Sequence, residues 1–195
     1  MKSRIIVCIL AILTLGLLAS YDMPKGWTAG GSARNYYEIG TDYGAGQGGK
    51  NAGTVRSIYK EIRGNGEMRQ SLDAENYKGK RLRLTGYLKT RNVDDWAGLY
   101  LRINGPKHTL LLGNEKRTMI SRDNMYNRSL KGTNDYTKCE VVLDVPDTAD
   151  NIMYGAVLNG PGQIWFDRMK LDIVGSDVPV TGGKLTKPTN LDFEE

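Results

Sequence analysis

The chain contains few of the side chains that ligate metals or act as nucleophiles. Its 195 residues include 2 cysteines and 1 histidine. Zinc sites are built from several Cys and His ligands, so this composition argues against a zinc site. Cys8 lies in the apolar N-terminal segment, which leaves Cys139 alone in the rest of the chain and excludes a structural disulfide there. We interpret Cys139 as a small core residue and His108 as a residue at the start of a surface strand.

Blocks of like charge are absent as well. The formal net charge is +5, and the 27 basic and 22 acidic residues are interspersed along the chain. Proteins that bind nucleic acids usually gather Lys and Arg into a patch or stripe. We therefore expect no nucleic-acid partner.

One long hydrophobic run is present, at the N-terminus. Two basic residues precede an apolar stretch from Ile5 to Ala19, which is the order of a secretory signal peptide. The stretch is shorter than the roughly 20 residues that a spanning helix needs. We expect residues 1–20 to be a signal peptide or an uncleaved N-terminal anchor, with a buried cytosolic helix as the remaining alternative. The protein would then be exported: periplasmic, extracellular, or membrane-anchored facing outward, with membrane contact only through an uncleaved N-terminal segment.

Helical periodicity is scarce, whereas alternation with a period of two recurs. In residues 80–89, Leu82, Leu84 and Leu88 fall on one face and charged or polar residues on the other. The same kind of pattern predicts further short strands at 53–60, 96–103, 108–113, 136–145, 151–160 and 163–174. Gly- and Asn-rich turns separate them, and only residues 115–131 offer room for a helical turn. The glycine-rich stretch 43–53 lacks the features of a phosphate-binding loop, so we expect a loop between two strands.

These features predict an all-β fold, a jelly-roll β-sandwich of two antiparallel sheets over residues 21–176. The segments GWTAGGSARNYYEIGTD, MRQSLDAENYKGKRLRLTGYLKT, DDWAGLYLRI and GQIWFDRMKLDIV resemble galactose-binding-like β-sandwiches, the jelly-roll domains of carbohydrate-binding modules. DNMYNRSLKGTNDY and PTNLDFEE are similar to bacterial domains described as effector domains of transcription regulators. The resemblance implies the sandwich fold and leaves the ligand open, since such sandwiches bind many ligands.

Sandwiches of this class commonly hold a structural calcium. The resemblance therefore implies a candidate calcium site with Asp167 and Glu194 as side-chain ligands, completed by backbone carbonyls near residues 49–51. The chain departs from the family pattern W-F-D-D at Arg168, which removes the second acid. We expect no cofactor apart from this candidate calcium.

A mixture of aromatic and polar side chains suits a sugar, whose ring has an apolar face and a rim of hydroxyls. Trp96, Tyr100 and Arg102 share strand parity, so they can face one sheet surface while Leu99, Leu101 and Ile103 face the core. The following stretch adds further candidate ligands: Asp123, Asn124, Tyr126 and Arg128. The alternative is that Trp96 is a core residue and the polar set a surface network. We expect Trp27 and Trp165 to be core residues.

No arrangement of residues demands catalysis: the adjacent Asp94 and Asp95 would point opposite ways on a strand. We therefore expect a non-catalytic domain that binds a carbohydrate or a similar polyhydroxylated ligand. A protein-interaction or regulatory effector domain that contacts a cell-envelope partner without binding sugar is the alternative. A glycoside hydrolase-like enzyme, which would need two opposed carboxylates, is the third.

The last residues alternate apolar and acidic side chains after a Gly- and Pro-containing linker, so residues 177–195 are predicted to be a linker and a C-terminal strand. In the sandwiches that this chain resembles, a segment like this one commonly comes first. We expect Asn190 to Glu194 to fill the first-strand position of the sandwich. A disordered remnant or the start of a second domain is the alternative.

Overall fold

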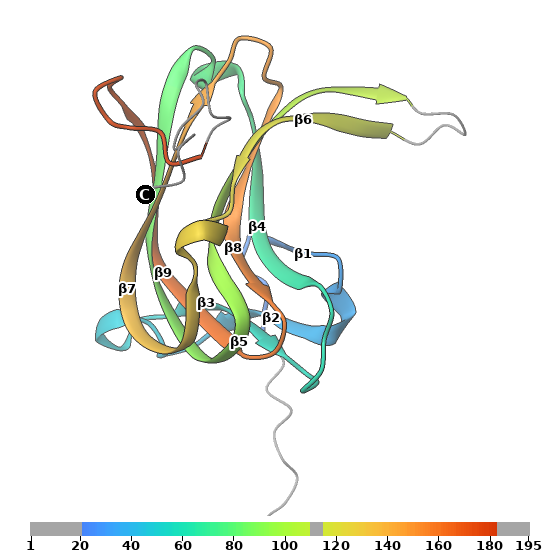
Figure 1. Ribbon diagram of the computed structural model, residues 1–195, viewed down its shortest axis with the longest axis vertical. Helices are drawn as coiled ribbons and strands as arrows, with labels where there is room; N and C mark the ends of the chain where they lie inside the picture. Colours follow the sequence, from blue (N-terminus) through green and yellow to red (C-terminus); the bar gives the residue numbers. More distant parts are fainter. Residues whose placement is uncertain (1–20, 110–114, 183–195) are drawn as a thin grey trace, which may run out of the picture.

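Nine β-strands form the regular structure of the described residues, which are 21–109 and 115–182 of the computed structural model (Figure 1). The strands are β1 Thr28–Gly30, β2 Tyr37–Asp42, β3 Ala52–Ser57, β4 Asn65–Asp73, β5 Lys80–Thr109, β6 Glu115–Asp123, β7 Leu130–Val145, β8 Asn151–Asn159 and β9 Gln163–Val174. Helical structure in these ranges is limited to four 3-10 turns, at Arg34–Tyr36, Gln47–Gly49, Glu75–Tyr77 and Tyr126–Arg128. None of them is long and apolar enough to span a membrane.

Strand β5 belongs to both layers of the sandwich. Its first part, residues 80–91, pairs with β7 on one side and β9 on the other, in the strand order β2-β3-β9-β5-β7 that we call the first layer. From Trp96 onward β5 pairs with β8, and from Leu101 onward also with β6, in the order β1-β4-β8-β5-β6 of the second layer; the start of β7 still pairs with β5 at Val93 and Ala97. Asn92 has a φ of 51°, and register shifts surround it where the strand crosses between layers. All these pairings are antiparallel, as the sequence predicts.

Figure 1 shows β7 and β9 on one side of the sandwich and β8 and β4 on the other, with the ends of β5 and β6 projecting as an arm. The two strands that the sequence predicts at 80–89 and 96–103 are thus one continuous strand. His108 lies exposed on the arm, paired with Lys116.

The core lies between the layers and follows the predicted alternation. The fully buried apolar side chains of β5 are Leu82, Leu84, Leu88, Ala97, Leu99, Leu101 and Ile103. Burying a leucine or isoleucine side chain contributes about 1.5–3 kcal/mol to stability. Cys139 of β7 lies in the same core, as predicted, and burial raises the pKa of its thiol to about 11.

Three features differ from the sequence expectations or were absent from them. Trp165 is buried, but on the outer side of the first layer: its indole Nε1 donates to Asp42 at 2.7 Å, and Arg91 lies 5.0 Å from its ring centre. Phe166, its neighbour, enters the core in its place. Strands β1, β2, β4 and β6 were not identified from the sequence. The adjacent aromatics Trp165 and Phe166 suggest a bulge or twist before them, but β9 is irregular after them, where Arg168 has a φ of 52°.

Several expectations lie outside the described residues. They are the signal peptide or anchor at residues 1–20, the C-terminal strand at Asn190 to Glu194, and Glu194 as a calcium ligand. The glycine-rich stretch 43–53 does connect two strands, β2 and β3, and contains one 3-10 turn.

Candidate functional site

A groove of about 210 Å³ lies on the outer face of the second layer. Strands β4, β5 and β8 pair side by side there, with Glu67 opposite Val157 and Tyr100 opposite Gly155. Since Met68 of β4 points into the core, the alternate residues of that strand face outward into the groove. The groove is lined by Asn65, Glu67, Trp96, Tyr100, Arg102, Arg122, Asn124, Met153 and Val157.

A glycine lets one wall of the groove approach the sheet. A Cβ atom on Gly98 of β5 would lie 2.9 Å from the Asn124 carbonyl oxygen and 3.0 Å from the Met125 Cβ. Met125 is buried with a φ of 59°, an uncommon backbone conformation for this residue type. The close packing at Gly98 and the left-handed turn at Met125 together place Asn124 at the groove.

The aromatic wall of the groove is a pair of rings. Trp96 is half-buried, and Tyr126 packs against it edge to face, with 5.7 Å between ring centroids and an interplanar angle of 89°. Tyr126 is 68% exposed, so its ring extends this wall toward solvent. Aromatic pairs of this geometry contribute about 0.5–1.5 kcal/mol beyond their burial.

Glu67 is the centre of the polar part of the groove. Its Oε2 accepts a hydrogen bond from the Tyr100 hydroxyl at 3.1 Å, and its Oε1 accepts one from Asn65 Nδ2 at 2.7 Å. Arg69 Nη1 lies 3.4 Å from Oε2. Burial, together with the nearby Glu67 charge, raises the pKa of Tyr100 well above its ordinary value. The Tyr100 hydroxyl therefore stays protonated and donates to the carboxylate.

Asp123 and Arg128 bind each other beside the groove and are not part of its lining. Arg128 Nη2 lies 2.5 Å from Asp123 Oδ2, which also accepts from the Thr181 hydroxyl at 2.7 Å. The Met125 backbone N–H donates to Asp123 Oδ1 at 2.8 Å. Burial of Asp123 acts to raise its pKa, but the hydrogen bonds from Arg128, Thr181 and Met125 outweigh it and hold the pKa below its ordinary value.

The structure thus brings Trp96, Tyr100, Arg102 and Asn124 together in the groove and places Tyr126 against Trp96. The other lining residues were not among the candidates that the sequence indicated: Asn65, Glu67, Arg122, Met153 and Val157. The alternation in residues 65–73, with Met68 inward and Glu67 outward, was the signal that could have identified β4.

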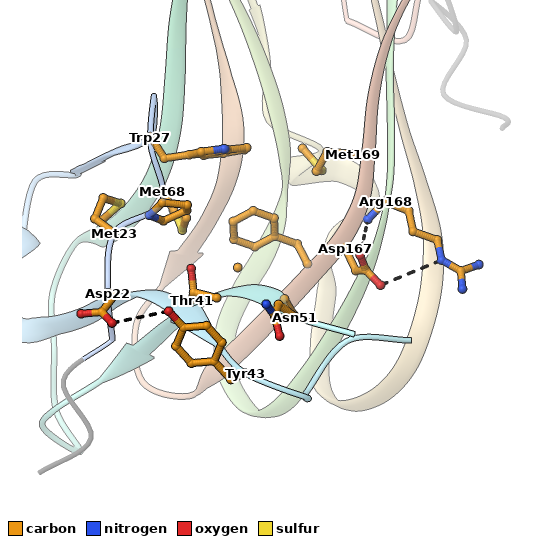
Figure 2. Close-up of a pocket in the computed structure, with 14 residues that line it drawn as sticks. Asp22, Met23, Trp27, Thr41, Tyr43, Asn51, Met68, Asp167, Arg168 and Met169 are labelled. Atoms are coloured by element: carbon orange, nitrogen blue, oxygen red, sulfur yellow. Dashed lines mark hydrogen bonds and ion pairs between the residues drawn. The ribbon is translucent and has the colours of Figure 1, made fainter. Parts of the chain in front are cut away.

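A second cleft of about 420 Å³ opens between the N-terminal segment, β2, β3 and β9 (Figure 2). Its floor is apolar: the rings of Trp27 and Phe166 lie 5.7 Å apart, with Met68 and Met169 beside them. Figure 2 shows Asp22 and Tyr43 across the cleft from Trp27, joined by a 3.4 Å hydrogen bond. Trp27 packs against the core while lining this cleft, close to the role that the sequence predicts.

Asp167, at one end of this cleft, does not have the surroundings of a cation ligand. Its carboxylate accepts backbone N–H groups from Gln47 at 3.0 Å and Arg168 at 2.6 Å, and the Arg168 guanidinium lies 3.9 Å away. Calcium requires six to eight oxygen ligands, whereas these neighbours are hydrogen-bond donors and a cation. In residues 21–109 and 115–182 no three Asp, Glu, His or Cys side chains are grouped so as to hold a metal. The described surroundings of Asp167 therefore do not fit the calcium that the resemblance implied, and the other candidate ligand, Glu194, lies outside the described residues.

Comparison with known proteins adds one sequence relative and a set of structural neighbours; no family model matches the chain. The chain is 36% identical over 177 residues to the uncharacterized HTH-type transcriptional regulator YbfP of Bacillus subtilis (strain 168). The match covers 88% of this chain but 57% of the relative, so the chain spans little more than half the length of that protein.

The structural neighbours are β-sandwiches from sugar-related proteins. A "putative sugar binding protein" from Bacteroides thetaiotaomicron VPI-5482 superposes with a TM-score of 0.54 and 13% identity, over 76% of this chain and 87% of that one. The CBM22-1-GH10 modules of xylanase Xyn10B from Clostridium thermocellum, in complex with xylohexaose, give a TM-score of 0.51 and 13% identity, over 80% of this chain and 27% of that one. At such identities the likeness concerns the fold alone. It confirms the expectation from the sequence: the chain has the β-sandwich, jelly-roll fold found in carbohydrate-binding modules.

Proposed function

We propose that this chain is a non-catalytic carbohydrate-binding domain whose ligand lies in the groove on the second layer. The observation that carries the proposal is the composition of the groove, in which the aromatic pair Trp96 and Tyr126 adjoins hydrogen-bonding groups from β4, β5 and the loop after β6. Sugars present an apolar ring face and a rim of hydroxyls, and this arrangement offers a partner for each.

The roles of the residues follow from their positions. Trp96 would stack on the face of a sugar ring, and Tyr126, perpendicular to it, would contact the edge of the sugar. We take the stacked contact to be worth about 0.5–1.5 kcal/mol beyond burial, as for a pair of aromatic rings. Glu67 would accept, and Arg102 would donate, hydrogen bonds to hydroxyl groups, each worth about 1.5–3 kcal/mol for a charged group. Asn124, fixed at the groove by the packing over Gly98, would both donate and accept.

A binding role is favoured over hydrolysis by the carboxylates. Glycoside hydrolysis needs two carboxyl groups facing each other across the bond that is cleaved. Glu67 is the one carboxylate among the residues that line the groove in the described part of the chain. Its two oxygens already accept hydrogen bonds from Tyr100 and Asn65. Glu67 is therefore assigned a binding role rather than an acid–base role.

Our proposals for the location and the partners of the protein rest on its sequence. The charged-then-apolar order of residues 1–20 supports export, with the sandwich facing the cell exterior or the periplasm. A ligand of the cell surface or the surroundings would then reach the groove directly. A cell-envelope protein is the alternative partner.

A regulatory sensor domain is the second candidate function, and the likeness to the HTH-type regulator favours it. In such a protein the sandwich would bind an effector or another protein, and no glycan would be required. A sugar in the groove is compatible with a sensor role, whereas a domain that binds no sugar is not compatible with our first proposal.

A glycan array probed with the full chain tests the proposal, followed by titration with the glycans that bind. Trp96→Ala should weaken binding about two- to tenfold, the effect of losing a stacked ring worth about 0.5–1.5 kcal/mol. Tyr43→Ala, which removes an exposed aromatic ring from the second cleft, is the matched control and should leave the affinity unchanged. The proposal is wrong if no glycan binds, or if Tyr43→Ala abolishes binding while Trp96→Ala does not.

A further inference from the structure

Two arginines lie directly opposite each other at one end of the groove. Arg102 of β5 pairs in register with Arg122 of β6, and both side chains line the groove. Trp96 and Arg102 are separated by six residues along β5, about 20 Å at the rise of a strand. One end of the groove is therefore aromatic and the other is cationic.

Like charges placed directly opposite on neighbouring strands destabilise a sheet. Most other strand arginines of this chain have a carboxylate partner, as Arg56 has Glu38 and Arg81 has Asp144. No described carboxylate lies within salt-bridge distance of Arg102 or Arg122. The pair is an exception to the way in which this chain neutralises such positions.

A neutral amide chain holds Arg102 in place. Its Nε donates to Asn104 Oδ1 at 2.6 Å, and Asn104, which is fully buried, donates from Nδ2 to Asn151 Oδ1 at 3.0 Å. This bond orients the guanidinium without neutralising its charge. Glu67, the carboxylate in the same groove, is already bonded to Tyr100, Asn65 and Arg69. The cationic end of the groove thus keeps an uncompensated positive charge.

We infer that the groove recognises an acidic saccharide, whose carboxylate or sulfate ester binds between Arg102 and Arg122 while another part of the ligand contacts Trp96. The inference rests on the proposed function and names its ligand class. Planar guanidinium groups bind carboxylate and sulfate oxygens through paired hydrogen bonds, which a neutral hydroxyl cannot replace in full. An anion between the two arginines would also remove their mutual repulsion.

Calorimetric titration of the full chain with matched ligands tests this inference. One pair is tetragalacturonate and its methyl ester; the other is a sulfated galactan oligosaccharide and its desulfated form. We expect one of the acidic ligands to bind at least tenfold more tightly than its neutral counterpart, with an affinity that falls as salt is added. The pair that shows the difference identifies carboxylate or sulfate ester as the group recognised.

Two variants test whether the preference for the acidic ligand arises at the cationic end of the groove. Arg122→Gln, at an exposed position that leaves the core untouched, should remove most of the preference for the acidic ligand, measured as the ratio of its affinity to that of its neutral counterpart. Lys116→Gln removes one positive charge from the same strand outside the groove and should change neither affinity. Melting curves establish that both variants are folded.

The outcomes separate the inference from the proposal beneath it. Equal affinity for acidic and neutral ligands in both pairs would overturn the inference and leave sugar binding standing. Equal losses in Arg122→Gln and Lys116→Gln would mean attraction by overall charge, which also overturns it. Absence of binding to any saccharide on the array would overturn both the acidic-ligand inference and the proposed carbohydrate-binding function.

Discussion

Replacing Asp123 by alanine should lower the stability of the fold by about 2–4 kcal/mol. The carboxylate is 6% exposed and holds Arg128, Thr181 and the Met125 backbone N–H. Breaking a buried ion pair costs about 3–5 kcal/mol, because the remaining charge loses its partner. Arg128 is 31% exposed and can be solvated, which reduces this cost. In a domain of this size the loss corresponds to a fall in Tm of about 5–15 °C.

Urea unfolding followed by tryptophan fluorescence measures this change. Asp144→Ala is the matched control: Asp144 pairs with Arg81 on the surface, is 60% exposed, and should cost at most about 1 kcal/mol. Equal losses for the two variants would refute our reasoning about burial. A fully stable Asp123→Ala variant with weakened sugar affinity would show that Asp123 is a ligand residue, as the sequence analysis predicted.

The pH dependence of stability provides a second test of the role of Asp123. The pKa of Asp123 is lower in the folded protein than in the unfolded chain, where a free aspartate titrates near pH 3.9. The stability that ionised Asp123 contributes is therefore fully present above about pH 4 and is lost as the pH falls through its folded pKa. Asp123→Ala should lack this part of the acid dependence, as measured by melting at a series of pH values.

Three further outcomes are expected. Tyr100→Phe removes a hydrogen bond to a charged group, so the free energy of unfolding should fall by about 1–2 kcal/mol in urea titration, and an unchanged value would show that the bond does not stabilise the fold. Gly98→Ala forces a Cβ against the Asn124 carbonyl, so it should lower the free energy of unfolding by about 1–3 kcal/mol and weaken saccharide binding. In the control Gly105→Ala, on the same strand, the added Cβ meets its nearest neighbour at 3.6 Å, so stability and saccharide affinity should change little. Burial raises the pKa of the Cys139 thiol to about 11, so this residue should resist iodoacetamide at pH 8 until urea unfolds the chain. Mass spectrometry of the peptide that contains Cys139 measures the alkylation, and rapid alkylation of the folded protein would contradict the expectation.

The sequence predicted the fold best where alternation was strong and long. Leu82, Leu84 and Leu88 face the core as expected, and so do Leu99, Leu101 and Ile103. The short strands were harder to identify, because β1 has three residues and β2 contains a glycine, which weakens the alternation. The union of residues 80–109 in one strand could not be foreseen. A left-handed Asn92 absorbs the change of layer, and local sequence alone does not reveal this conformation.

Only part of the candidate site was predicted, because the sequence shows which residues of one strand share a face but not which strands lie side by side. Trp96, Tyr100 and Arg102 lie on one strand, and parity alone placed them on one face. Glu67 and Arg122 come from other strands, and only the register between strands brings them to the groove. Asp123 and Arg128 are as polar as the lining residues, but their burial against Thr181 depends on a segment that is distant in sequence.

The sharing of β5 between the layers has a consequence for the synthesis of the chain. When a ribosome has made residues 80–109, the partners of this strand on all sides, β6 to β9, have not yet been made. The second layer cannot close until β8 emerges, and the first cannot close until β9 emerges, so a nascent chain exposes a long strand rich in leucine with both edges unpaired. Such segments are prone to aggregate during synthesis. Arrest before β8 should therefore leave both layers of the sandwich incomplete, and chaperone binding to stalled chains should end once β9 has been released.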